Sequence, residues 1–102
     1  VKMELENKRK IKIDGRQSNL KYKCPCCGFY TFEHRPNGSD DICKVCFWED
    51  DLLQLNDPNL EGGANNVSLI QGRENFLKFG ACEEEMIPYV RKPKEDELKG
   101  ID

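Results

Sequence analysis

The clearest pattern of hydrophobic and polar positions lies in the second half of the chain. Apolar or small residues recur there at the spacing of one helix face: Leu69, Gly72, Phe76 and Phe79. Ser68 precedes this run and Gln71 follows three residues later, which is the arrangement of a capping box. Gly80 is placed to end the helix in a left-handed conformation. The pattern therefore predicts a helix over residues 69–79.

Shorter patterns elsewhere predict strands and turns. Residues 10–14 and 19–23 alternate polar and apolar side chains around an Asp-Gly turn, so they are expected to form a hairpin. Residues 29–32 are aromatic or β-branched, which favours a strand, and residues 35–39 have the composition of a turn. Residues 52–55 are expected to form a short strand or turn. The whole pattern indicates a small α+β fold of short β-hairpins with one packed helix.

The hydrophobic content is low for a chain of this length. Leu, Ile, Val and Phe together number 24 of 102 residues, just above the level at which a charged chain stays disordered. A core this thin rarely stabilises a domain alone, so a cross-link is expected. The composition excludes a large α/β enzyme and a coiled coil, and the longest apolar run, residues 45–48, is too short to cross a membrane.

Charge divides the chain into unequal parts. Residues 1–23 carry eight Lys and Arg against three acids, whereas residues 24–82 carry four against nine. We therefore expect a basic N-terminal arm over residues 1–21, a cysteine-rich domain over residues 22–90, and a charged, mobile tail over residues 91–102 that has little to bury. The acidic middle repels phosphate backbones, which disfavours nucleic acid as the partner of the domain.

Six cysteines carry the candidate chemistry. Four of them form two C-x₂-C pairs separated by fifteen residues, a recognised zinc spacing: Cys24, Cys27, Cys43 and Cys46. Gly28 supplies the backbone freedom that the first turn needs. Four thiolates complete a tetrahedral shell and leave no open position, so we expect one structural Zn²⁺, which is preferred over iron. No signal peptide is visible in the first ten residues, so a cytoplasmic location, where thiols bind metal more often than they pair, is expected.

Three further residues have alternative roles. Cys26 is either a redox-active thiol or a small, partly buried neighbour of the metal, and we favour the second. Cys82 precedes three glutamates, whose charges would raise the pKa of its thiol, and we expect a packing residue. His34 could replace a sulfur ligand, but a lone histidine on a turn is more often at the surface.

An aromatic and acidic segment follows the second cysteine pair. Phe47 and Trp48 are expected to shield the sulfurs from water. The acids that follow suit either a solvated face or a surface for a partner protein. The residues of this candidate partner surface are Trp48, Glu49, Asp50, Asp51 and Asp57.

The ordered motifs resemble the cysteine-rich CPCC family of small, mostly bacterial proteins. The resemblance covers residues 22–92 and rests on these segments: Cys24-Pro25-Cys26-Cys27-Gly28-Phe29, Asp41-Ile42-Cys43, Val45 to Asp51, Gly62-Gly63-Ala64-Asn65, Val67-Ser68-Leu69, Arg73 to Phe76 and Phe79 to Cys82. Lys44 stands where proline is expected in this family, which leaves both sulfurs of the second pair in place. The resemblance implies a zinc-ribbon-like domain, and the family has no settled activity.

Three classes of function follow from these observations. We expect a protein-interaction module, and the type of small bacterial protein suggests an immunity-type inhibitor of a secreted toxin. The alternative is a nucleic-acid-binding zinc ribbon that uses the basic stretch from Lys8 to Lys23. An enzyme ranks last, because no open metal position or activated nucleophile is evident and no catalytic residue can be assigned.

Overall fold

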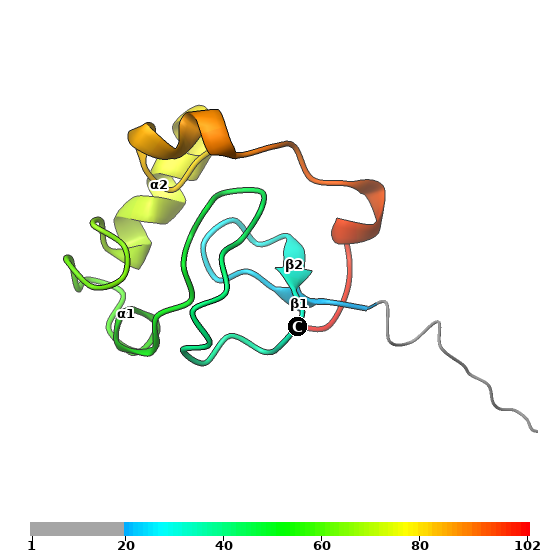
Figure 1. Cartoon of the computed structure of the whole chain (residues 1–102), viewed down its shortest axis with the longest axis horizontal. Helices are drawn as coiled ribbons and strands as arrows, with labels where there is room; N and C mark the ends of the chain where they lie inside the picture. Colours follow the sequence, from blue (N-terminus) through cyan, green and yellow to red (C-terminus); the bar gives the residue numbers. More distant parts are fainter. Residues whose placement is uncertain (1–19) are drawn as a thin grey trace, which may run out of the picture.

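The computed structural model describes residues 20–102. Its elements, in chain order, are β1 (Tyr22–Lys23), β2 (Tyr30–Phe32), α1 (Leu52–Asn56), α2 (Leu69–Phe79) and two 3₁₀ helices, η3 (Glu84–Tyr89) and η4 (Glu95–Glu97). The two strands pair antiparallel. Figure 1 shows loops in the middle of the molecule, α2 and η3 along one side, and the C-terminal segment returning to β1. The predicted small α+β fold is confirmed.

The helix α2 has the bounds that its sequence pattern predicts. Ser68 Oγ accepts a hydrogen bond from the amide of Gln71 at 3.1 Å, and Gly80 ends the helix at a φ of 83°. The second half of the capping box is absent, because the Gln71 amide group donates to Asn75 instead. At Gly72 the helix backbone approaches the core so closely that an added Cβ would lie 3.2 Å from Cys26 Sγ.

The segment predicted as a strand or turn at residues 52–55 is instead the short helix α1. Asp51 is its N-cap, and its carboxylate accepts hydrogen bonds from the amides of Leu53 and Gln54 at 2.8 and 3.3 Å. Asp is among the strongest N-cap residues. The run of leucines therefore has a helical start signal that the prediction overlooked.

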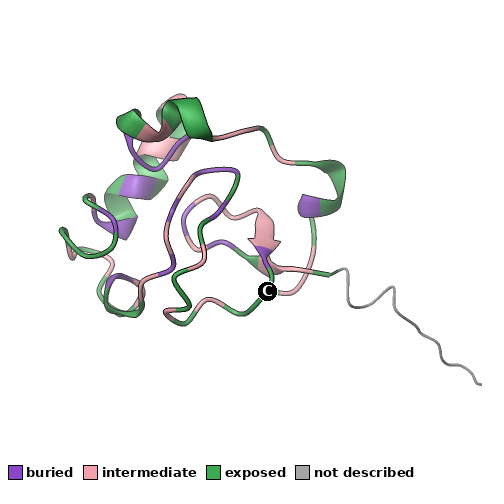
Figure 2. Cartoon of the chain, in the orientation of Figure 1, coloured by how far each residue is buried: buried purple, intermediate pink, exposed green. Residues whose placement is uncertain are grey.

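The core is small and rich in sulfur. Its largest fully buried side chains without polar atoms belong to Phe32, Leu69 and Val45, and Trp48 lies among them with 1% of its surface exposed. Five of the nine buried residues in the cluster are cysteines. Figure 2 shows buried segments in the central loops and near the start of α2, where Leu69 and Gly72 are buried. The expected thin core is present, and it surrounds the cysteines.

The C-terminal segment, expected to have little to bury, contacts the hairpin through polar groups. Ile101 exchanges backbone hydrogen bonds with Lys21 and Lys23 at 2.9 and 3.2 Å. Arg91 makes two hydrogen bonds of 2.8 Å to the carboxylate of Glu97, which is 4% exposed. The prediction counted few apolar side chains, whereas this segment is held mainly by backbone pairing and by an ion pair.

Two predictions concern residues that the structure does not describe. The first strand of the predicted hairpin, residues 10–14, and most of the basic arm lie in residues 1–19, outside the described residues. Of the predicted second strand, residues 19–23, Tyr22 and Lys23 form β1 and pair with β2.

Within residues 20–102, no helix has the length and apolar character needed to span a membrane.

Candidate metal centre

Two loops of the same construction carry the four paired cysteines. In the first, the amide of Gly28 donates to the Cys24 carbonyl at 2.9 Å, and the amide of Cys24 donates to the Phe29 carbonyl at 2.8 Å. In the second, Phe47 donates to Cys43 at 2.8 Å, and Cys43 donates to Trp48 at 2.9 Å. We call these loops the first knuckle (residues 24–29) and the second knuckle (residues 43–48). Their matching hydrogen bonds orient both cysteines of each pair toward one point.

A left-handed residue directly follows each cysteine pair and turns the chain back. Gly28 has a φ of 85°, as the sequence predicts for this position. Phe47 occupies the equivalent place in the second knuckle with a φ of 71°, although a bulky aromatic residue rarely adopts this conformation. The sequence analysis did not detect this strained turn, because no glycine marks it.

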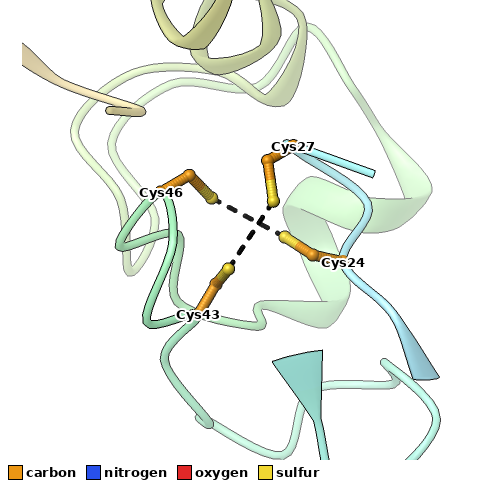
Figure 3. Close-up of side chains that lie close together, drawn as sticks. All are labelled: Cys24, Cys27, Cys43 and Cys46. Carbon is orange, nitrogen blue, oxygen red and sulfur yellow. Dashed lines mark hydrogen bonds between the residues drawn. The ribbon is translucent and has the colours of Figure 1, made fainter. Parts of the chain in front are cut away.

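The four sulfur atoms converge in the centre of the fold. Figure 3 shows the side chains of Cys24, Cys27, Cys43 and Cys46 pointing toward one another from the two knuckles. All four sulfurs lie within 4.8 Å of one another. Cys24 Sγ lies 3.7 Å from Cys46 Sγ, and Cys27 Sγ lies 3.7 Å from Cys43 Sγ. The predicted ligand set is therefore brought together by the fold.

The spacing of the sulfurs fits a tetrahedral metal ion. Bonds of about 2.3 Å from Zn²⁺ to four sulfurs give tetrahedron edges of about 3.8 Å, close to the two 3.7 Å separations. A disulfide needs sulfurs about 2 Å apart, and all six cysteines are free. The four cysteines could thus hold one metal ion with no position left for a substrate.

The electrostatics of the four thiols also favour a cation. Hydrogen bonds from Cys24, Cys27 and Cys46 lower the pKa of Cys43. Burial raises the pKa of Cys24, and the hydrogen bond with Cys24 raises that of Cys46. Several thiolates in one buried place repel one another. A divalent cation at the centre would offset this repulsion and allow all four to ionise.

Neighbouring groups support the sulfurs from outside. Thr31 Oγ1 donates a hydrogen bond to Cys43 Sγ at 3.0 Å, and the amide of Cys26 lies 3.4 Å from Cys24 Sγ. Donors of this kind orient ligands and stabilise their negative charge. The sequence gives no signal for this role of Thr31, because Thr31 lies twelve residues from Cys43 and only the fold brings the two side chains together.

The three residues with open roles are now placed. Cys26 is 7% exposed and packs beside α2, which agrees with a small buried neighbour of the metal site. Cys82 is 1% exposed, and burial, more than the charge of Glu83, raises the pKa of its thiol. The packing role is supported, but the predicted cause of the shift was only partly right. His34 is exposed and lies outside the sulfur cluster.

The predicted partner surface divides into buried and accessible residues. Trp48 and Asp50 are 1% and 0% exposed, so neither can contact a partner. Asp50 Oδ2 instead accepts hydrogen bonds of 2.9 Å from the amides of residues 37–39 and from the Ser39 hydroxyl. The sequence pattern was misleading because a run of acids is usually solvated, whereas here one acid binds the turn of residues 37–39.

The remaining three acids of that surface can be reached. Asp57 is exposed, and Glu49 and Asp51 are half-buried. Partial burial raises the pKa of Glu49, and the nearby charges of Asp40 and Asp51 add to this effect. The Ala64 amide, which donates to Asp51 at 2.7 Å, lowers the pKa of that carboxyl. We call these three residues the acidic face; within it, Glu49 and Asp51 lie close enough for their charges to interact.

A buried amide pair that the sequence analysis missed holds this face in place. Gln54 Nε2 donates to the carbonyls of Leu60, Asn65 and Val67 at 2.9 to 3.1 Å. The side chain of Asn65 bonds both the amide and the carbonyl of Glu49 at 2.8 Å. Fully satisfied polar networks of this kind rigidify a core. The Gly-Gly-Ala-Asn motif was a signal for it, but alone it indicated only a loop.

Comparison with known proteins adds one finding to this geometry. A family model described as Cysteine-rich CPCC matches residues 22–97. No curated protein matches the chain well enough to add to that result. The match includes both knuckles, α2 and most of the segment that packs back on the hairpin.

Proposed function

The chain belongs to the cysteine-rich CPCC family, and we propose that it is a protein-interaction module whose fold depends on one structural zinc ion. The convergence of four cysteine sulfurs within 4.8 Å carries the metal part of the proposal. Zinc is the ion that best suits a closed shell of four thiolates. Structural zinc in small modules contributes on the order of 10 kcal/mol to folding, which would offset the thin core.

The ligand assignment is tested by metal content. We expect one zinc ion per chain after purification without added chelator. Substitution of a ligand, as in Cys46→Ser, should abolish the binding, because three sulfurs leave the shell incomplete. Cys26→Ala and Cys82→Ala are matched controls that remove a buried sulfur outside the cluster. Equal zinc content in Cys46→Ser and in the controls would contradict the assignment.

The accessible acids support the interaction part of the proposal. Asn65 bonds the backbone of Glu49, and the Ala64 amide bonds the Asp51 carboxylate. Asp57 ends α1, the helix that carries Gln54. A fixed, negatively charged face steers association with a positively charged partner surface and favours it over neutral ones. We therefore extend the proposal to an inhibitor of the immunity type, which would occupy the basic cleft of a toxin that acts on nucleic acids.

Charge reversal tests this extension in the native host. Affinity purification of the whole chain should recover a basic protein partner, and the double variant Glu49→Lys with Asp57→Lys should lose it. The matched control reverses Glu74, an exposed acid on α2. Retention of the same partner by the double variant would refute the acidic-face mechanism, while zinc content reports separately on the metal site.

A further inference from the structure

A groove of about 350 Å³ lies beside the second knuckle. Its lining residues are Ile42, Lys44, Phe47, Tyr89 and Arg91. One wall is therefore the knuckle that carries two of the metal ligands, and the other is the end of η3 with the segment that follows it. In Figure 1 these are the green loop and the orange segment.

The groove exposes large apolar side chains next to one another. Tyr89 and Ile42 are 65% and 42% exposed, and the ring of Tyr89 lies on that of Phe47 with 5.5 Å between centroids. Aromatic residues are enriched at the centres of protein interfaces, because they supply large contact areas at a low cost in conformational entropy. The exposed ring of Tyr89, stacked on the half-buried ring of Phe47, therefore gives the hollow an aromatic wall that a partner residue could pack against.

The backbone at Phe47 is a second and independent observation. Its φ of 71° is the conformation that Gly28 adopts at the equivalent position of the first knuckle. A glycine would satisfy this turn without strain. The chain instead places a phenylalanine there, and strained residues of this kind cluster at functional sites. The strained residue, Phe47, is also one of the residues that line the groove.

The charges of the groove select the kind of partner. Lys44 and Arg91 line it, and no carboxylate does. The Arg91 guanidinium is bound by Glu97, but within residues 20–102 no ion pair involves Lys44. A lysine without an ion pair in this part of the chain, beside an apolar floor, complements a segment that has an acidic residue next to an apolar one.

From the aromatic pair, the strained turn and the charge of Lys44, we infer that this groove binds an acidic peptide segment of a partner protein through an apolar or aromatic anchor residue. The segment would place its anchor against Phe47 and Tyr89 and a carboxylate beside Lys44. This site is distinct in its residues and in the sign of its charge from the acidic face. A protein with both would contact basic and acidic regions of its partners through different surfaces.

The test is a selection of random displayed peptides against the whole zinc-loaded chain. Enriched peptides should contain Asp or Glu next to an aromatic or leucine residue. Fluorescence anisotropy with the synthesised peptides should show at least tenfold weaker binding to Lys44→Glu and to Tyr89→Ala. The matched controls, Lys78→Glu and Leu77→Ala, make the same changes at exposed positions of α2 and should bind as the wild type does.

Several results would overturn the inference. One is a selection that enriches no peptide, or only peptides without acidic residues. Another is equal affinity for the groove variants and the α2 controls, with zinc content showing that all are folded. A short oligothymidylate that binds more tightly than any peptide and is lost in Tyr89→Ala would assign the groove to base stacking instead.

Discussion

Replacing Asp50 with asparagine should destabilise the protein, although the sequence pattern predicts an accessible position for this residue, on a solvated face or a partner surface. The substitution keeps the size of the side chain but removes the charge from an oxygen that accepts four hydrogen bonds of 2.9 Å. The donors are the amides of residues 37–39 and the hydroxyl of Ser39. The effect measures how much the loop that precedes the second knuckle depends on this carboxylate.

The magnitude follows from the number of donors and their exposure. A hydrogen bond to a charged group contributes about 1.5–3 kcal/mol, but bonds that share one acceptor are not additive. Asn37 and Ser39 are exposed, so water replaces part of what is lost. We expect Asp50→Asn to lower the free energy of unfolding by about 2–3 kcal/mol. Asp57→Asn, at an exposed position, should change it by less than about 0.5 kcal/mol.

Urea unfolding followed by tryptophan fluorescence gives the comparison directly. Trp48 is the single tryptophan and is 1% exposed, so its emission reports on the core. The zinc activity must be buffered at the same value for every variant, because bound metal adds to the apparent stability. If Asp50→Asn and Asp57→Asn prove equally stable, Asp50 does not support the turn and our account of its burial is wrong.

Three further predictions concern α2, the metal site and the C-terminal segment. Gly72→Ala should destabilise the protein despite the helix propensity of alanine, because the added methyl would crowd Cys26 Sγ at 3.2 Å. Gln71→Ala, on the exposed side of α2, is the control. A higher urea midpoint for Gly72→Ala than for the wild type would contradict this prediction. Thr31→Val should weaken zinc binding about tenfold in a chelator competition, because it removes the hydroxyl donor to Cys43, whereas Tyr30→Phe should not. Hydrogen bonds from Arg91 lower the pKa of Glu97 below its ordinary value of 4.5. The ionised carboxylate therefore stabilises the folded state above pH 4.5. This contribution is lost as the pH falls through the pKa that Glu97 has in the folded protein. The difference in unfolding free energy between wild type and Glu97→Gln should shrink over that acidic range, and a difference independent of pH would refute this assignment.

The sequence by itself determined the features that depend on neighbouring residues. Helix α2 has the predicted bounds because its face, its Ser68 cap and its Gly80 terminator all lie within one short stretch. The ligand set was predictable for the same reason, since the spacing of Cys24 and Cys27 already places two sulfurs on one turn. The start of α1 also had a local signal, because Asp is a preferred N-cap residue and Asp51 caps this helix. The prediction of a strand or turn at residues 52–55 overlooked it.

Only the tertiary structure decided what each side chain faces. Asp50 and Glu49 are adjacent acids, but one is fully buried among the amides of residues 37–39 and the other remains half-exposed. The segment after Arg91 has few apolar residues, and its attachment depends on backbone groups of the hairpin, about 80 residues earlier at Lys21. Burial and long-range pairing are set by the free energy of the whole fold. A pattern of residue types shows how polar and apolar residues alternate along a stretch of chain. It does not show which distant segment packs against that stretch.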